Sequence, residues 1–346
     1  MDTSSTLDRA LDRLHRTDFA YAAGGVDGLS NHGPMAAASL AELGAEDRIE
    51  PFVARYLRRL RPLPAPSLAP ARLGDEASAR AFLATYEAAF ACGDALGSLA
   101  ATLRPLLPGA VAAATHGWLR TAHAAWALAA ADTPSRRREM AFGLASWAST
   151  FQRVPGDPGS RRQPGLDVAR ALAQVPLLPP SARREAGLIV DRVAQCAEVD
   201  GFEAAVAAVD LDAKPFEATV GVLTRSAARL FLANPTERFV YLHAVTASSA
   251  LRLVAPHLDG PTARAALGAV FHAVAALHAT HGEPDSGASV LREPERCDAP
   301  SRESVRARAA ASDDDHAVKL GAAALREHAA TGDGTFLEVA EAWLAR

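Results

Sequence analysis

Apolar residues recur at helical spacing along almost the whole chain, and strict alternation of apolar and polar residues is nearly absent. Alanine, leucine, arginine and glutamate, which all favour helices, fill most of these segments. We therefore expect no strand and an all-α fold, a single large multi-helix domain over residues 1–346. The predicted helices cover residues 5–16, 34–44, 46–60, 75–91, 108–131, 135–151, 181–198, 213–231, 236–257, 261–281, 313–330 and 335–345.

Three stretches interrupt the helical pattern. Residues 61–74 carry four prolines, which predicts an extended connection. Residues 153–165 combine proline and glycine and predict an exposed loop, and residues 282–301 are polar with three prolines and predict a surface loop or lid. Loops of this length inside a domain are often functional or disordered.

The composition is that of a globular protein rather than a disordered one, with 49% hydrophobic and 22% charged residues. The 36 basic and 40 acidic residues are interspersed and give a net charge of -4. No basic block looks able to follow a phosphate backbone, so we expect no nucleic-acid partner.

We also expect neither a membrane span nor a disulfide framework. The longest apolar stretches, 106–131 and 265–279, are rich in alanine and contain histidine, which indicates buried helices. The three cysteines form no CxxC pair, which argues against a thiolate zinc site. The N-terminus has no basic and then apolar leader, so a cytoplasmic location is expected, and a homodimer stays open.

Histidines supply the candidate chemistry. His32 lies just before Pro34, which suits a first helical turn, so the imidazole can either point into a cavity or simply cap the turn. His116, Arg120 and His123 are spaced i, i+4 and i+7 and share one face of an apolar helix. A buried polar stripe is costly unless it is paired or functional, so these residues are either hydrogen-bonded core residues or ligands.

Two more motifs lie in the C-terminal half. His243 and Thr246 are spaced i and i+3 in another apolar helix, where a core histidine is an equally good explanation. His316 and Lys319 have the same spacing and follow aspartates that favour a helix start. A lysine here is either a surface residue or, when buried, a neutral amine. Such an amine can bind a metal directly or react with carbon dioxide to give an anionic carbamate ligand.

No common enzyme fingerprint competes with these motifs. The sequence contains no dinucleotide-binding or phosphate-binding glycine loop, no HExxH zinc motif and no GxSxG motif. The candidate residues come from all parts of the chain, which favours one domain over two. We therefore expect antiparallel helix pairs around a central metal and substrate cavity.

Four stretches, in order, resemble motifs of the questin oxidase-like family. The resemblance runs from about residue 14 to the C-terminus, and the order makes it more specific than any one short motif. The chain is shorter than the fungal members of that family, so its substrate is expected to differ. The matching residues are 29–35 with 41–44, 107–109 with 115–120, 243–246, and 314–319.

The resemblance implies a mononuclear non-haem iron(II) oxygenase of natural-product biosynthesis. Its substrates would be O2 and an aromatic polyketide such as an anthraquinone. The reaction would be oxidative ring cleavage or Baeyer–Villiger-type oxygen insertion. Carried over position by position, the metal ligands are His32, His116, His243, His316 and Lys319, the last one carboxylated or not.

Three further residues are expected to be catalytic, namely Arg120, His123 and Thr246. Arg120 would balance an anionic oxygen of the substrate or carbamate, and His123 shares a helix face with His116 and competes with it as ligand. Asp314 or Asp315 would orient a histidine. An aromatic pocket or ordinary core packing equally explains Tyr21, Trp118 and Phe271.

Three alternatives remain. The first is an NADPH-dependent Baeyer–Villiger oxidase without a metal, although no dinucleotide motif supports NADPH. The second is a zinc-type hydrolase, because histidines with a carboxylated lysine also suit zinc-activated water. The third is a non-catalytic helical scaffold that binds a partner.

Overall fold

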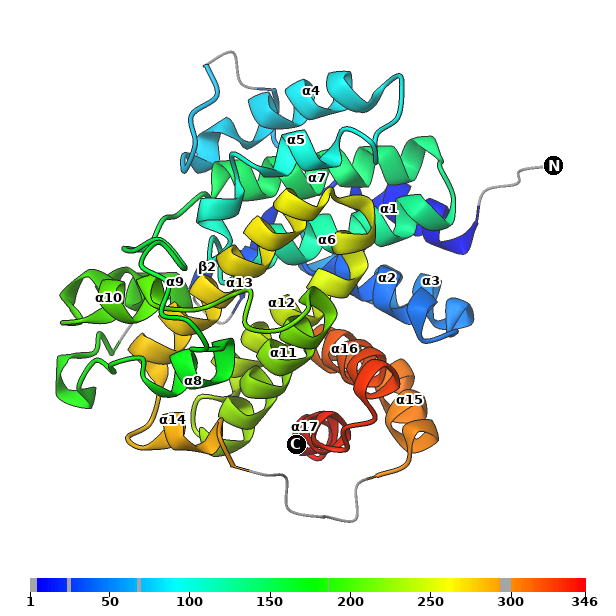
Figure 1. The fold of residues 1–346 in the computed structure, drawn as a ribbon. Coiled ribbons are helices and arrows are strands. Elements are labelled where there is room, and N and C mark those ends of the chain that lie inside the picture. Colours follow the sequence, from blue (N-terminus) through cyan, green and yellow to red (C-terminus); the bar gives the residue numbers. More distant parts are fainter. Residues whose placement is uncertain (1–4, 24–25, 67–69, 186, 293–299) are drawn as a thin grey trace.

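Helices dominate the structure. A computed structural model of the chain describes residues 5–23, 26–66, 70–185, 187–292 and 300–346. Most of these residues lie in helices, which confirms the all-α fold class (Figure 1). The described residues also contain one two-stranded sheet. None of the described helices is long and apolar enough to cross a membrane.

The helices follow one another along the chain, with longer connections between α3 and α4 and between α7 and α8. They are α1 (Thr6–Leu14), α2 (Gly33–Glu42), α3 (Glu46–Tyr56), α4 (Ala79–Phe90), α5 (Leu99–Leu103), α6 (His116–Ala130), α7 (Pro134–Ser149), α8 (Val168–Ala173), α9 (Ile189–Val193), α10 (Phe202–Ala207), α11 (Phe216–Ala233), α12 (Arg238–Val254), α13 (Gly260–His281), α14 (Ser286–Ser289), α15 (Arg302–Ala311), α16 (Asp315–Thr331) and α17 (Thr335–Leu344).

Most predicted helices match observed ones to within a few residues, but the prediction of one helix over 181–198 is wrong. The described residues there form two short 3-10 helices with α9 between them. The carboxylate of Asp191 accepts a hydrogen bond from the backbone N–H of Leu188 at 2.7 Å, which starts a new helix at this point.

The predicted loops are largely confirmed. The described parts of 61–74 and 153–165 contain no helix. The predicted loop over 282–301 includes the short helix α14, and its residues 293–299 lie outside the described residues. No helix was predicted where α15 lies. Its start is stabilised by the Ser301 side chain, which accepts a hydrogen bond from the Ser304 backbone N–H at 3.1 Å.

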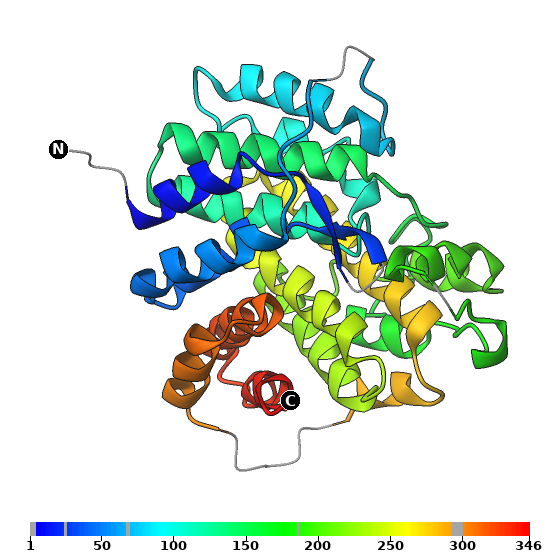
Figure 2. The same cartoon turned by 180° about the vertical axis from the view of Figure 1, so that it is seen from behind.

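A short hairpin contradicts the expectation that the chain has no strand. Strands β1 (Ala20–Ala23) and β2 (Val26–Ser30) pair antiparallel (Figure 2). In this pairing Tyr21 lies opposite Leu29. The strands are short and rich in alanine and glycine, so they lack the β-branched pattern that a sequence prediction needs. The backbone N–H of Asn31, which donates to the carbonyl of Phe19 at 2.8 Å, extends the pairing to the start of α2.

The predicted helix over 108–131 begins later than expected, at His116. Ala113, Ala114 and Thr115 have φ angles of 47°, 54° and 71°, in the left-handed region that L-residues rarely adopt. Such strained residues persist only where the surrounding structure holds them, and they cluster at functional sites. The three residues aim the chain so that His116 opens α6.

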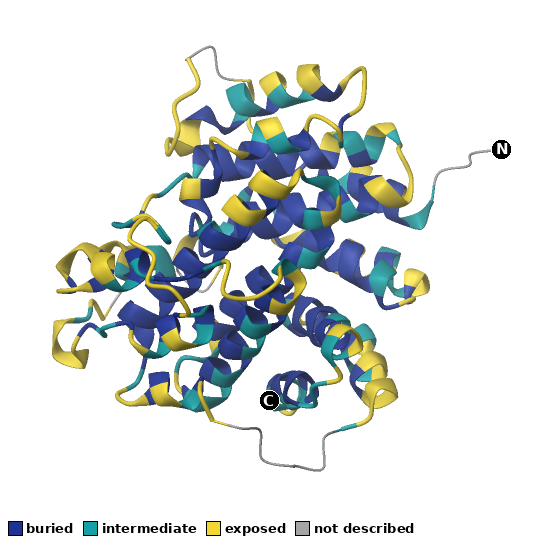
Figure 3. Cartoon of the chain, viewed as in Figure 1, coloured by how far each residue is buried: buried dark blue, intermediate teal, exposed yellow. Residues whose placement is uncertain are grey.

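One continuous apolar core joins the helices that carry the predicted histidines. Helix α6 packs against α7 and α12, and α16 packs against α2 and α12. Figure 3 shows that these central helices are mostly buried. Gly117 permits the close approach of α6 and α7, because a Cβ atom there would lie 2.5 Å from the Cβ atom of Trp147.

Candidate metal centre

Four histidines meet in the interior, three of them in helices and His32 immediately before α2. Their rings form a closed circuit, with centroid distances of 4.4 Å from His32 to His116 and 4.8 Å from His116 to His243. The circuit closes with 5.7 Å from His243 to His316 and 4.7 Å from His316 to His32. These are the four histidines that the sequence motifs predicted as ligands, and the structure brings them together.

The chain places His32 by fixing its backbone. His32 lies immediately before α2, and its backbone N–H donates a hydrogen bond to the Tyr56 hydroxyl at 2.8 Å. The next residue is Gly33, where a Cβ atom would lie 2.6 Å from a methyl carbon of Leu14. The start of α2 therefore sits tightly against α1 and α3. No sequence signal pointed to Tyr56, because its role depends on the packing of α3.

Two of the rings turn one nitrogen outward, to oxygen partners on the chain. His32 Nδ1 is hydrogen-bonded to Asp315, and His116 Nδ1 is hydrogen-bonded to the carbonyl of Ala113 in the left-handed segment. Partners of this kind fix the ring orientation and assign the Nδ1–H tautomer, which leaves Nε2 as the free donor of an electron pair.

The other two rings also have an oxygen atom of the chain near Nδ1. His243 Nδ1 donates to the Phe239 carbonyl at 2.8 Å, one turn earlier in α12. His316 Nδ1 lies 3.4 Å from the Asp314 carboxylate. The expectation that Asp314 or Asp315 orients a histidine thus matches the geometry for both, with Asp314 beside His316 and Asp315 beside His32.

Three buried ring nitrogens of the circuit lack a hydrogen-bond partner. The Nε2 atoms of His116, His243 and His316 are buried and have no hydrogen-bond partner among the described residues. A buried polar atom that lacks a partner is costly. Three such atoms on one ring circuit are therefore candidate ligands for a cation.

Lys319 lies one turn after Asp315 in α16 and is 3% exposed. Its charge acts on the rings of His32, His116 and His243. Burial lowers the pKa of Lys319 to about 8, although nearby Asp315 raises it. The amine is thus unusually easy to deprotonate.

Three of the four imidazoles are held in the neutral form, which is the form that binds metals. Burial and the Lys319 charge lower the pKa of His32 to about 3, and burial holds the pKa values of His116 and His243 well below the usual value. Burial alone would raise the pKa of Asp315, but His32 and its neighbours hold it well below its usual value. Near neutral pH the rings of His32, His116 and His243 are therefore neutral, and Asp315 is a carboxylate.

Asp315 is also a candidate ligand by position. Ligand atoms of His32, Asp315 and His316 all lie within 4.8 Å of one another. One oxygen of Asp315 is already hydrogen-bonded to His32 Nδ1, however, and this contact is typical of a carboxylate that orients a metal-binding histidine. The geometry therefore favours Asp315 as a residue that orients His32 rather than as a direct metal ligand.

The structure pairs Arg120 away from the four rings. Its guanidinium donates to both oxygens of Glu139 in α7, at 2.6 and 3.0 Å, and His15 Nε2 lies 2.9 Å from the same carboxylate. All three residues are buried. The hydrogen bonds of Arg120 are thus directed to α7. No contact among the described residues supports the expectation that Arg120 balances an anionic oxygen at the metal.

His123 and Thr246 lie on the expected helices but outside the ring circuit. His123 is buried near Lys319, and among the described residues it makes no ring contact with the four histidines. The Thr246 hydroxyl donates to the Leu242 carbonyl at 2.9 Å within its own helix. The circuit therefore contains His116 rather than His123, and the catalytic roles of His123 and Thr246 stay predictions.

Of the three aromatic residues considered for a pocket, two lie in the core and one lies near the histidine cluster. Trp118 and Phe271 are fully buried, and the Trp118 indole N–H donates to the Ala247 carbonyl at 2.9 Å, which indicates core packing. Tyr21 instead lies beside Tyr56, with ring centroids 6.2 Å apart, and its phenol is close enough to feel the Asp315 charge. Of the three, Tyr21 is near the cluster.

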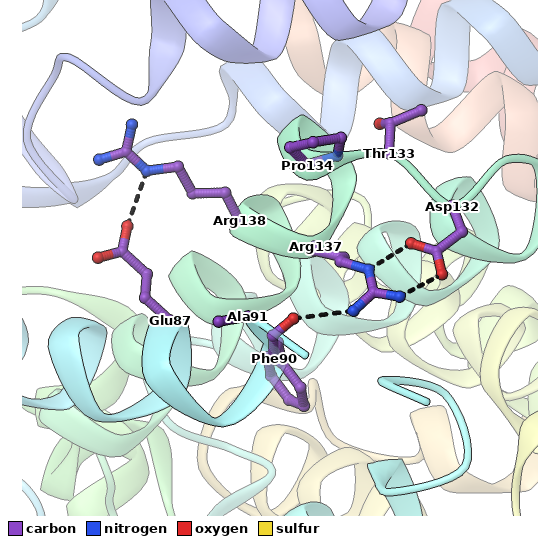
Figure 4. A pocket seen from close by; sticks show the side chains of 8 residues that line it. All are labelled: Glu87, Phe90, Ala91, Asp132, Thr133, Pro134, Arg137 and Arg138. Atoms are coloured by element: carbon purple, nitrogen blue, oxygen red, sulfur yellow. Dashed lines mark hydrogen bonds and ion pairs between the residues drawn. The ribbon is translucent and has the colours of Figure 1, made fainter. Parts of the chain in front are cut away.

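A cavity of about 440 Å³ between α4 and α7 lies elsewhere in the molecule (Figure 4). Its charged side chains already bind one another, since Arg137 pairs with Asp132 and Arg138 pairs with Glu87. None of its lining residues belongs to the histidine cluster. This cavity therefore does not serve the candidate metal centre.

Comparison with known proteins agrees with the resemblance of the sequence motifs. No curated protein matches the chain. A family model described as questin oxidase-like matches residues 29–324, a span that covers most of the chain and includes all four histidines and Lys319. The chain therefore belongs to the questin oxidase-like family.

Proposed function

We propose that the protein is a non-haem iron(II) oxygenase that uses O2 to oxidise an aromatic polyketide of the anthraquinone type. Its reaction would be ring cleavage or Baeyer–Villiger-type oxygen insertion. The observation that carries the proposal is the set of three buried, unpartnered Nε2 atoms on one circuit of four histidines. Membership of a family named for an oxidase supports an oxidoreductase.

The donor set fits iron(II). Imidazole nitrogen suits this ion, and an oxygen ligand from a carboxylated Lys319 would complete a mixed nitrogen and oxygen set. The pKa of about 8 leaves about half of the Lys319 amines neutral at pH 8, and the neutral amine is the form that reacts with carbon dioxide. Iron(II) bound here would supply the electron transfer that lets O2 react with an electron-rich ring.

The helix ends around the centre favour negative charge. His32 caps the start of α2, His116 is the first residue of α6, and His316 is the second residue of α16. The start of a helix carries a partial positive charge, so three such ends favour an anion among the rings. A carbamate on Lys319 and an ionised phenol of the substrate are anions of this kind.

The proposal is tested by metal content and oxygen uptake. We expect the purified protein to hold about one iron ion per chain and to consume O2 when it is given anthrone or a hydroxyanthraquinone. Zinc in place of iron would favour a hydrolase. Equal oxygen uptake by metal-free protein with NADPH would contradict the proposal and support the metal-free oxidase.

A charge-removing variant of Asp315 tests how the cluster holds the metal. Asp315→Asn keeps the size of the side chain but removes the carboxylate that orients His32. We expect the affinity for iron(II) to fall about 10–100-fold, measured by competition with a chelator. Asp313→Asn is the matched control, because the Asp313 side chain is 64% exposed and pairs with Arg55 at the surface. Equal affinity in both variants would refute this role of Asp315.

A further inference from the structure

One large apolar side chain at the surface touches the histidine cluster. Phe239 in α12 is 47% exposed. Its ring centroid lies 5.4 Å from that of His243 and 5.1 Å from that of His316. Isolated apolar residues at a surface are common and need no explanation, but this ring is in contact with two of the four rings of the candidate metal centre.

The cluster is most open on this side. His32, His116, His243 and Lys319 are all buried, whereas His316 is only partly so, with 13% of its side chain exposed. His316 is the ring that Phe239 approaches most closely. A molecule that reaches the inner nitrogens past His316 therefore meets Phe239.

A second aromatic ring forms a fixed wall at the same place. The ring of Trp343 in α17 lies 6.2 Å from His316 and 6.4 Å from Phe239. Its indole N–H donates to Asp314 at 2.8 Å, and the guanidinium of Arg346 lies 4.6 Å from its ring centroid. Trp343 is thus held and largely covered, which leaves Phe239 as the exposed aromatic face.

We infer that Phe239 is the specificity-determining residue on which a planar aromatic substrate stacks as it enters the metal centre. This inference rests on the proposed function for the class of substrate. Aromatic rings prefer offset stacks or edge-to-face contacts, which a fused planar ring can make with Phe239 while its oxygen-bearing edge points to the histidines. The position beside two candidate ligands explains why an exposed apolar ring stands here.

The inference is tested by binding rather than turnover. The probe is β-hydroxyanthraquinone, whose binding beside Trp343 is expected to quench part of the tryptophan fluorescence, and its Kd is measured with O2 excluded. We expect Phe239→Ala to raise this Kd about tenfold and Phe239→Tyr, which keeps the ring, to restore binding. Iron content should not change in Phe239→Ala, because the backbone carbonyl that accepts from His243 Nδ1 remains.

Leu73→Ala is the matched control, because Leu73 is 52% exposed and lies in the loop before α4. An unchanged Kd in Phe239→Ala, or an equal loss in Leu73→Ala, would overturn the inference. If the wild-type protein holds iron but does not bind the probe, the inference fails while the metal proposal stands. If Phe239→Ala alone loses the probe and the wild-type protein holds no iron, the inference stands and the oxygenase proposal fails.

Discussion

His243→Ala is expected to remove the metal while leaving the protein folded. His243 contributes one of the three buried, unpartnered Nε2 atoms, and its ring contacts both His116 and His316. Loss of a partner that merely orients a ligand typically costs 10–100-fold in metal affinity. Loss of a ligand itself should cost more, at least about 100-fold. The measurement is iron content after purification, together with an iron(II) titration of the stripped protein.

A buried histidine outside the cluster provides the control. His272 in α13 is 6% exposed, and its Nε2 is hydrogen-bonded to the Pro155 carbonyl at 2.8 Å. His272→Ala removes a ring of the same size and should keep its iron. Circular dichroism would show that both variants fold. Full iron occupancy in folded His243→Ala would remove His243 from the ligand set and refute the four-histidine centre.

Glu139→Ala is expected to cost about 3–5 kcal/mol of unfolding free energy, because it leaves a buried arginine without its counter-charge. The side chains of Arg120 and Glu139 are only 3% and 4% exposed. Burial alone would raise the pKa of Glu139, but Arg120 and His15 hold it below its usual value, so the carboxylate is ionised at neutral pH. The loss would be measured by urea unfolding at neutral pH.

The same helix offers a matched pair at the surface. Arg138 in α7 binds Glu87, and their side chains are 44% and 36% exposed. Glu87→Ala should therefore cost no more than about 1 kcal/mol. If Glu139→Ala is as mild as Glu87→Ala, then Arg120 is not held by Glu139, and a role of Arg120 near the metal becomes credible again.

The contrast between Arg120 and His116 shows what the spacing of residues along a helix can predict and what it cannot. Both residues lie on one face of α6, as their spacing predicted, yet His116 joins the ring circuit and Arg120 pairs with Glu139. Helical spacing determines the face of a helix that a side chain occupies. Which neighbour that side chain meets depends on the packing of α7 and α2 against α6, and spacing along one helix does not contain this information.

The left-handed turn and the hairpin could not be predicted from the sequence for a related reason. The left-handed turn at Ala113–Thr115 is formed by residues that prefer the right-handed region, and the short hairpin strands contain three alanines and one glycine, which have little strand preference. In both places the local preference is weak or opposed, and contacts with the rest of the molecule decide the conformation.

The sequence by itself determined that the chain folds as helices and that its unusual polar residues lie on apolar faces, because helical periodicity is a local property. The motifs also identified the four histidines and Lys319. Only the tertiary structure decided that the four rings meet, that each Nδ1 has an oxygen neighbour, and that Phe239 lies at the most exposed ring. Distances between side chains on different helices follow from how the helices pack, and that packing is a property of the whole core.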